Sequence, residues 1–320
     1  MATADPAHLE GRVRAAEVAL AAHYGRTLVE HLIPTAAGST VRVVEYPAIG
    51  ASDAAAGLPP ILLLHGIASV TALAVPLLGA LADRRVLAVD WPGHGLSGAD
   101  VLPTGTALRA HAVAGVEEVM AFFQVAVVDA IGHSLGGQVA LYAAVAHPER
   151  LRKLVLLGAP GAAFSQARAT WGMRVASIPG LGTAVLGLST SSRAHARAVD
   201  RLLGAGVLDG SPPEINEIGF LASQRPEFAA SVASLFRAMM TPFAARADVA
   251  LTASELAHLA VPTLIVWGQD DAILTPAHGR ASAEAIPKVA ILEVEGGHAP
   301  WLNEPDRVGD AVSAFSLSRV

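Results

Sequence analysis

The stretch that most constrains the fold is the pentapeptide from Gly132 to Gly136, which reads Gly-His-Ser-Leu-Gly. It follows a mostly apolar run, residues 125–130, and opens a helical pattern over residues 135–146. A Gly-x-Ser-x-Gly sequence between a strand and a helix forms a tight turn that exposes the serine hydroxyl. The flanking glycines are needed because side chains there would collide with the neighbouring strand or helix. We therefore predict that Ser134 is held in a strained backbone conformation and aimed out of the sheet.

The composition narrows the class of protein. With 320 residues, of which 52% are hydrophobic and 16% charged, the chain can bury the core of an α/β domain with an insertion. The absence of cysteine excludes disulfides, thiolate nucleophiles and cysteine-ligated metals. A net charge of −6 gives no indication of nucleic acid or of an anionic membrane surface as a partner. No signal-peptide pattern and no apolar run of about 20 residues is visible, so we expect a soluble, cytoplasmic protein without a membrane span.

Hydrophobic spacing in the first half of the chain predicts alternating helices and strands. We expect an N-terminal helix, an antiparallel hairpin, a strand buried on both faces, a helix disturbed by Pro76, a further strand and a further helix. In that order, these elements occupy residues 6–24, 27–33 with 39–46, 61–64, 70–83, 85–89 and 106–123. Strands that alternate with helices imply a mostly parallel, doubly wound sheet with helices on both faces.

The alternation of strands and helices stops after a strand predicted over residues 153–157. Buried-strand runs disappear, and helical stretches rich in alanine, glycine and proline replace them. Strands return at residues 261–267 and 289–294, with a helix over 276–286 between them and a final helix from Glu304-Pro305. We therefore divide the chain into residues 1–161 (first part of an α/β core), 162–258 (an inserted helical cap) and 259–320 (second part of the core).

Candidate catalytic residues lie at the ends of predicted strands. A serine hydroxyl needs a base to become a nucleophile at neutral pH, and the base needs a carboxylate that orients it. Functional groups in doubly wound sheets gather beyond the carboxyl ends of the strands. One such end is followed by Asp270 and Asp271, and the next by His298. The order serine, aspartate, histidine predicts a catalytic triad of Ser134, an aspartate at 270 or 271, and His298.

Five ordered motifs resemble those of capped α/β-hydrolase-fold serine hydrolases, which include small esterases, lactonases, C–C bond hydrolases and cofactor-free haloperoxidases. The motifs are His65-Gly66, Asp90-x-Pro-Gly-x-Gly-x-Ser97, Gly132-His-Ser-Leu-Gly136, Gly268-x-x-Asp271-x-Ile273-x-x-Pro276, and Gly297-His298 ahead of Glu304-Pro305. They span the chain from about residue 60 to its end, apart from the cap. A serine at position 134 argues against the epoxide hydrolases and haloalkane dehalogenases, which resemble this pattern but attack with an aspartate.

The resemblance implies which carboxylate completes the triad. The family's spacing between Gly268 and Pro276 favours Asp271, and leaves Asp270 as a solvated turn residue. Some relatives place this acid after the strand that follows the elbow. This alternative position of the acid is excluded here, because no Asp or Glu occurs between Glu149 and Asp200.

The resemblance also implies an oxyanion hole and several structural residues. The oxyanion donors are expected to be the backbone N–H groups of Ile67 and Leu135. We expect His65 to brace the loop that carries Ile67, and His133 to be structural. The roles of two aromatic residues are left open: His94 and Trp301 either line the substrate pocket or pack inside the protein. A last group is expected to shape a neighbouring loop: Asp90, Gly93, Gly95 and Ser97.

The cap's apolar residues and a positively charged segment each allow two interpretations. The aromatic and methionine residues of the cap either form an apolar substrate pocket or, for most of them, the cap's own core. All charges between Arg152 and Asp200 are positive, which would suit either steering of an anionic substrate or a solvated helix face. Neither a phosphate loop nor a dinucleotide motif is present, and three histidines lack helical metal-ligand spacing with a carboxylate partner: His195, His258 and His278. We expect no metal and no organic cofactor.

The leading hypothesis for function is hydrolysis of a small carboxylic ester or lactone through an acyl-enzyme, with a small and mostly apolar substrate as the only expected partner. An alternative is C–C bond cleavage of vinylogous diketones by the same triad. Enzymes of that kind usually have a more glycine-rich oxyanion loop than residues 65–69, which read His-Gly-Ile-Ala-Ser. A further alternative is a ligand receptor that binds a small apolar molecule under the cap. The sequence does not indicate the oligomeric state.

Overall fold

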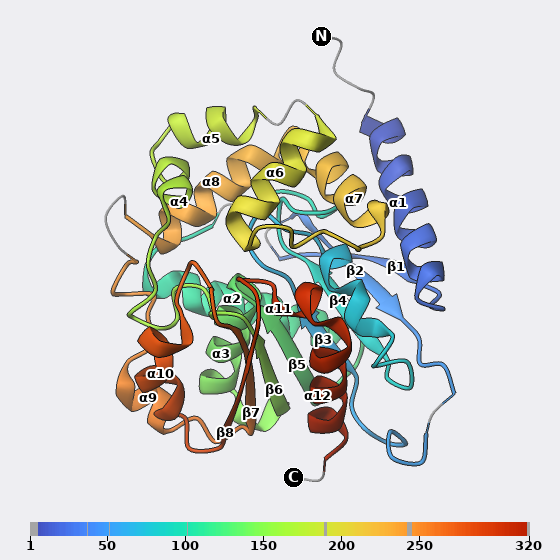
Figure 1. Cartoon of the computed structure of the whole chain (residues 1–320), viewed down its shortest axis with the longest axis vertical. Helices are drawn as coiled ribbons and strands as arrows, with labels where there is room; N and C mark the ends of the chain where they lie inside the picture. Colours follow the sequence, from blue (N-terminus) through green and yellow to red (C-terminus); the bar gives the residue numbers. More distant parts are fainter. Residues whose placement is uncertain are drawn as a thin grey trace.

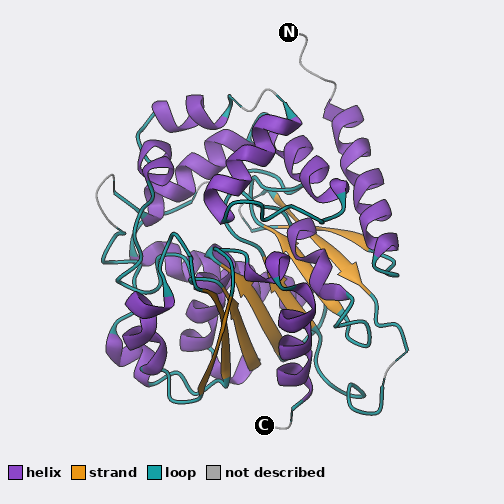
Figure 2. Cartoon of the chain, in the orientation of Figure 1, coloured by secondary structure: helices purple, strands orange, loops and turns teal. Residues whose placement is uncertain are grey.

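A computed structural model describes residues 6–36, 38–50, 52–100, 102–188, 191–241 and 245–318 of the chain. An eight-stranded sheet lies at its centre (Figure 1), and helices cover both faces of this sheet (Figure 2). The arrangement confirms the predicted α/β class.

The sheet is mostly parallel, with the strand order β1-β2-β4-β3-β5-β6-β7-β8. β1 pairs with β2 in antiparallel fashion, and so does β2 with β4, whereas every other pair is parallel. The predicted N-terminal hairpin is therefore the antiparallel edge of a parallel sheet. The strand bounds are β1 Val29–Pro34, β2 Thr40–Tyr46, β3 Ile61–Leu64, β4 Val86–Asp90, β5 Val128–His133, β6 Leu151–Leu157, β7 Thr263–Gly268 and β8 Val289–Val294.

Helices connect most of these strands. Their bounds in the core are α1 Pro6–His23, η1 Thr71–Leu78, α2 Thr106–Phe122, α3 Leu135–Ala146, η2 Pro148–Arg150, α10 Pro276–Glu284, α11 Pro300–Asn303 and α12 Pro305–Leu317. Between β6 and β7 lie α4 Trp171–Ala176, α5 Leu181–Leu186, α6 Ser192–Leu203, α7 Pro213–Ser223, α8 Phe228–Met239 and α9 Ala253–Ala257. We call α4 to α9 the inserted helices.

Two apolar layers cover the sheet, one on each face. Leu62 and Leu64 of β3 belong to the layer that contains α2 and α3, whereas Ile61 and Leu63 belong to the layer that contains α1, η1 and α12. Successive side chains of a strand point to opposite faces. A strand covered on both faces is therefore apolar at every position, which is why a continuous apolar run predicted β3 correctly.

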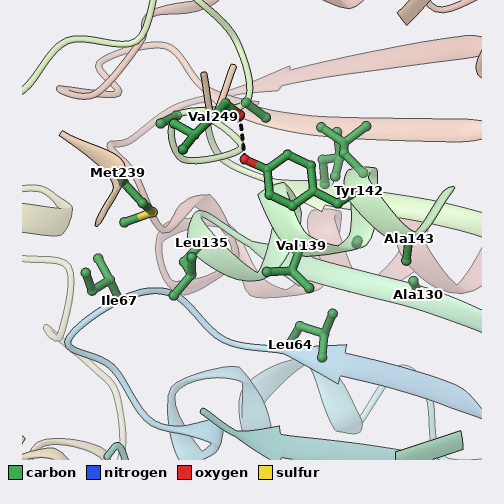
Figure 3. Close-up of a cluster of buried hydrophobic side chains, with 14 of the residues drawn as sticks. Leu64, Ile67, Ala130, Leu135, Val139, Tyr142, Ala143, Met239 and Val249 are labelled. Atoms are coloured by element: carbon green, nitrogen blue, oxygen red, sulfur yellow. Dashed lines mark hydrogen bonds between the residues drawn. The ribbon is translucent and has the colours of Figure 1, made fainter. Parts of the chain in front are cut away.

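Helix α3 anchors the first of these layers directly behind the elbow (Figure 3). Its Val139 belongs to the same cluster of buried side chains as Leu64. The inserted segment reaches this layer through Met239 of α8, and through Val249, whose carbonyl accepts a hydrogen bond from the Tyr142 hydroxyl. These contacts tie the inserted helices to the helix that follows Ser134.

The structure differs from the sequence analysis at η1, at the start of β5 and at α11. The α-helix predicted over residues 70–83 is wrong, because η1 is a 3-10 helix that ends at Leu78. Pro76 lies inside it, and a proline lacks the N–H and the space that a regular α-helix requires. Strand β5 begins at Val128, three residues after the start of the apolar run. The short helix α11 before α12 was not predicted.

A buried ionic network holds the loop that follows β4. Arg42 of β2, 1% exposed, donates hydrogen bonds to Glu17 of α1, to Glu30 of β1 and to Asp90 at the end of β4. Burial would raise the pKa of Asp90, but the charge of Arg42 holds that pKa below its usual value. The carboxylate of Asp90 also accepts two backbone N–H groups, from Thr71 at the start of η1 (3.2 Å) and from Leu96 in the loop (3.2 Å).

Close packing around Asp90 accounts for the Pro-Gly-x-Gly-x-Ser sequence that follows it. A Cβ atom at Gly95 would lie 2.0 Å from the Asp90 carboxylate, and one at Gly93 would lie 2.0 Å from the Ser231 hydroxyl. The Ser97 hydroxyl donates to the Asp90 carbonyl at 2.7 Å and accepts the Arg42 N–H at 2.8 Å. The structure thus favours the loop-shaping role expected for this motif.

Candidate active site

The predicted elbow is present at the junction of β5 and α3. Ser134 has φ +50° and ψ −113°, which is one of three positive φ values at non-glycine residues in the described part of the chain. A Cβ at Gly136 would lie 2.0 Å from the Leu64 carbonyl oxygen, and one at Gly132 would lie 2.5 Å from the Gly136 backbone. The strand and the helix approach so closely that only glycine fits on either side of Ser134.

The backbone strain at Ser134 predicts an effect on stability. Ser134→Gly and Ser134→Ala both remove the hydroxyl, but only glycine adopts this conformation without strain. Strain of this kind costs about 1–3 kcal/mol, and glycine's extra entropy in the unfolded chain offsets about 0.5–1 kcal/mol of the relief. We expect Ser134→Gly to be more stable than Ser134→Ala by about 1 kcal/mol in urea unfolding. Equal free energies of unfolding would show that the turn is not strained.

His298 and Asp271 form a buried pair beside this turn. The Nδ1 atom of His298, in the loop after β8, lies 2.8 Å from Oδ2 of Asp271, in the loop after β7. Asp271 also accepts hydrogen bonds from the backbone N–H groups of Ala159 (2.9 Å), Ile273 (2.9 Å) and Leu274 (3.3 Å). Burial would raise the pKa of Asp271, but His298 and these donors lower it below its usual value.

Asp270 lies outside this arrangement. Its side chain is exposed, whereas Asp271 is 1% exposed. The backbone N–H of Asp270 donates to the Gly296 carbonyl, which holds the loop after β7 against the loop after β8. The geometry therefore pairs His298 with Asp271, the carboxylate that the motif spacing favours.

Ser134 and His298 line one small pocket of about 50 Å³. Within the described residues, the Nε2 atom of His298 is buried without a hydrogen-bond partner. The backbone N–H of His298 donates to the Leu203 carbonyl at 2.7 Å, so the end of α6 positions the histidine loop. The imidazole is thus held through Nδ1 and the main chain, while Nε2 is left uncommitted.

Of the two predicted oxyanion donors, Ile67 lines the same pocket, and Leu135 directly follows the pocket residue Ser134. Leu135 is the first residue of α3, and Ile67 follows His65-Gly66 at the end of β3. No acceptor for either backbone N–H is found within the described part of the chain. The next residue, Ala68, has a positive φ of 56°, so the loop that carries Ile67 is itself strained.

His94 holds this strained loop in place through a hydrogen bond to Ala68. Its Nε2 accepts the backbone N–H of Ala68 at 3.1 Å, and its Nδ1 lies 3.1 Å from the Pro92 carbonyl. Burial and the nearby His65 lower the pKa of His94 to about 3. The ring is therefore neutral, with its proton on Nδ1, and it serves as an acceptor for the loop.

The structure favours the packing alternative for both aromatic residues whose roles the sequence left open. His94 is fully buried against His65 and Phe228 and does not line the pocket of Ser134. Trp301 is also fully buried, and its indole N–H donates to the Leu73 carbonyl at 3.0 Å. The ring of Trp301 packs edge-on against His133, which lines the pocket, but Trp301 itself does not line it.

The lowered pKa of His94 predicts that acid destabilises the protein. An unfolded histidine has a pKa of about 6.5, so below this pH the unfolded chain takes up a proton that folded His94 does not. Stability from this group is therefore complete above pH 6.5 and is lost as the pH falls, by up to about 1.4 kcal/mol per pH unit. His94→Gln keeps an acceptor without titrating. In urea unfolding between pH 6.5 and 4.5, we expect this variant to lose stability less steeply than the wild type. The exposed variant His8→Gln is the control, and identical slopes for all three proteins would contradict the assignment.

His65 and His133 occupy supporting positions. His65 Nδ1 lies 2.7 Å from the Gly66 carbonyl, and its Nε2 accepts the backbone N–H of Trp91 at 3.1 Å, so it braces the loop before Ile67. His133 Nε2 lies 3.0 Å from the His298 carbonyl. Burial and the neighbouring His298 lower the pKa of His133 well below its usual value. A neutral His133 then donates from Nε2 to the loop that carries His298.

Two pocket residues were not predicted from the sequence: His195 of α6 and Asn216 of α7, whose Nδ1 and Oδ1 atoms lie 2.9 Å apart. Met173 of α4 also lines the pocket, and is one of the cap methionines for which the sequence left a pocket role open. Burial lowers the pKa of His195. These residues come from inserted helices whose sequences contain no motif, so no local signal identifies them. Most of the remaining lining is aliphatic.

The fold and the site together define the class of protein. A model of the alpha/beta hydrolase family matches residues 61–311, and the chain belongs to this family. The match begins at β3 and ends inside α12, so it includes both strand ends that carry Asp271 and His298.

Known relatives within the family perform different hydrolytic reactions. The chain is 29% identical over 270 residues to a pimeloyl-[acyl-carrier protein] methyl ester esterase of Xanthomonas campestris, covering 80% of this chain and 94% of the relative. It is 32% identical over 280 residues to a 2-hydroxymuconate semialdehyde hydrolase of Pseudomonas sp., covering 82% and 88%. The structure of carboxylesterase CesB from Bacillus subtilis has a TM-score of 0.72 at 18% identity, covering 96% of this chain and 98% of that one. The protein is therefore a hydrolase, and the relatives do not decide between ester and C–C bond cleavage.

None of the helices in the described ranges combines the length and the apolar character needed to cross a bilayer.

Proposed function

We propose that this chain is a serine hydrolase that cleaves a small carboxylic ester or lactone through an acyl-enzyme. The observation that carries the proposal is the buried His298–Asp271 pair, 2.8 Å apart, in contact with the pocket that Ser134 lines. The strained turn at Ser134 supports it, because strain in a tight strand-to-helix turn of this kind serves to expose a reacting group.

In the proposed first step, Ser134 attacks the carbonyl carbon of the substrate while Nε2 of His298 takes the hydroxyl proton. Asp271 keeps the other imidazole proton on Nδ1 and stabilises the imidazolium that forms. The negative charge on the carbonyl oxygen would be met by the N–H groups of Ile67 and Leu135. A single donor of this kind is worth about 3 kcal/mol in the transition state.

In the second step, His298 returns its proton to the leaving alcohol, and water then replaces the alcohol. His298 activates this water by the same proton transfer, and its attack releases the acid and restores Ser134. For a lactone, the leaving alcohol stays attached to the acyl group, so one product leaves after the second step.

The pocket points to short and apolar acyl groups. Its volume of about 50 Å³ is far below the roughly 300 Å³ of a typical ligand pocket. Ile67, Leu73 and Met173 give part of it an apolar wall. We further propose that residues 162–258, which contain the inserted helices, form a cap that limits the length of the substrate. Residues of α4, α6 and α7 line the pocket together with Ser134.

C–C bond cleavage is the second candidate, and the 32% identical relative named 2-hydroxymuconate semialdehyde hydrolase favours it. The two reactions can share a triad, so substrate preference separates them. We expect a higher kcat/KM for short p-nitrophenyl esters or lactones than for a vinylogous diketone. A preference for the diketone would replace the leading proposal with C–C cleavage. Labelling of Ser134 by a fluorophosphonate without turnover of any substrate, together with stabilisation by an apolar ligand, would instead indicate a receptor.

A further inference from the structure

Large hydrophobic side chains are exposed along α4, α5 and the turns beside them. Leu181 and Val185 lie about one turn apart on α5, Ile178 lies in the turn that precedes α5, and Leu188 follows the last residue of α5 by two positions. Their exposed fractions are 36% for Ile178, 47% for Leu181, 42% for Val185 and 67% for Leu188. Trp171, at the start of α4, is 79% exposed. These five residues, which we call the apolar stripe, are half of the large hydrophobic residues that are exposed in the described part of the chain.

The segment of the chain that carries the apolar stripe is positively charged. No Asp or Glu occurs between Glu149 and Asp200, although the whole chain has a net charge of −6. Among the described residues, none of the exposed arginines between positions 168 and 201 forms an ion pair with a carboxylate: Arg168, Arg174, Arg193, Arg197 and Arg201. The net charge of the chain therefore conceals a local basic region.

The apolar stripe lies on the outer side of the inserted helices. Figure 1 shows α5 at the upper edge of the molecule, far from the sheet. The same group of helices reaches the pocket of Ser134 from its inner side, through Met173 of α4 and Val199 of α6. A surface that holds this edge would lie next to the helices that cover the pocket.

We propose that the apolar stripe docks the protein on a bilayer that contains anionic lipids. Short helices with tryptophan and aliphatic residues on one side and arginines around them are typical of interfacial binding. Tryptophan prefers the level of the lipid headgroups, and the arginines would lie at the lipid phosphates. This proposal does not depend on the proposed reaction.

Charge argues against a second copy of the chain as the occupant. A twofold interface brings the same surface of two subunits together. Pairing through the apolar stripe would therefore bring Arg168 and Arg174, which flank Trp171 in the sequence, close to the same residues of the other copy, which is unfavourable. An anionic bilayer removes this repulsion and accepts a protruding apolar edge.

Trp171 offers a direct probe of docking. The other three tryptophans are buried, with exposed fractions of 8% for Trp91 and 0% for Trp267 and Trp301. With vesicles of phosphatidylcholine and phosphatidylglycerol, we expect the fluorescence emission to shift to the blue and to be quenched by brominated lipid. Both signals should be absent in Trp171→Phe and with vesicles of phosphatidylcholine alone.

Sedimentation with the same vesicles tests the two parts of the surface separately. Arg174→Gln and Arg197→Gln should each weaken binding about fivefold. Val185→Ser with Leu188→Ser should abolish binding, whereas Phe122→Ser, which changes a residue 47% exposed on α2, should not affect it. All these variants should hydrolyse dissolved ester like the wild type, so loss of docking is distinguishable from failure of the proposed reaction.

Three outcomes would overturn the proposal. The first is no binding of the wild type to either kind of vesicle. The second is equal binding of the arginine variants and the wild type. The third is a dimer in light scattering that Leu188→Ser disrupts, which would make a second copy the occupant. Binding of an acidic protein through the arginines, with no binding to vesicles, would likewise replace the bilayer.

Discussion

Ser134→Ala is expected to lower ester turnover about a million-fold, the scale of loss seen when a triad serine is removed. The reason is that alanine leaves His298 and Asp271 in place but removes the oxygen that attacks the substrate. Turnover by the wild type and the variant, measured with a short p-nitrophenyl ester, checks this expectation.

Ser69→Ala is the matched control for this loss. Ser69 lines the same pocket, but its hydroxyl lies 3.4 Å from the Val70 carbonyl and has no part in the proposed reaction. We expect this variant to retain turnover within about tenfold. A Ser134→Ala protein that remains folded and turns over ester at the wild-type rate would exclude Ser134 as the nucleophile.

Asp271→Asn is expected to lower turnover about ten-thousand-fold. The carboxylate accepts hydrogen bonds on both oxygens, from His298 and Ala159 on one side and from Ile273 on the other. An asparagine NH₂ group would face donors on either side. If it faces His298, the imidazole moves its proton to Nε2 and can no longer accept the proton of Ser134. Steady-state kinetics of a folded variant, checked by near-ultraviolet circular dichroism, measures the effect.

Asp270→Asn makes the same chemical change one residue earlier and serves as the control. The Asp270 side chain is exposed, so we expect turnover within a few-fold of the wild type. If Asp270→Asn loses activity and Asp271→Asn keeps it, the assignment of the two carboxylates is reversed.

The sequence predicted the parts of the site that depend on local structure. The elbow could be recognised because only glycine fits at position 136, against Leu64, and at position 132, against the backbone of Gly136. His298 and Asp271 could be located because a parallel sheet brings its strand ends to one edge. The choice between Asp270 and Asp271 needed more, since burial differs between the two only after β7 and β8 have paired.

The rest of the site depends on contacts between distant segments. His94 supports Ala68 from another loop, and nothing near residue 94 indicates that its ring accepts a hydrogen bond there. His195 and Asn216 reach the pocket from the inserted helices, where hydrophobic spacing predicts helices but not which side faces Ser134. Pro76 was expected to disturb a helix, but the 3-10 geometry of η1 could not be derived from its position alone.

Reaction with a short-chain fluorophosphonate tests the central claim most directly, because this reagent is attacked by an activated serine and the adduct is stable. We predict a single covalent adduct on the wild type, located on Ser134 by peptide mass spectrometry, that forms far more slowly on His298→Ala. A folded wild type that carries no adduct, or carries it on another residue, would contradict the account.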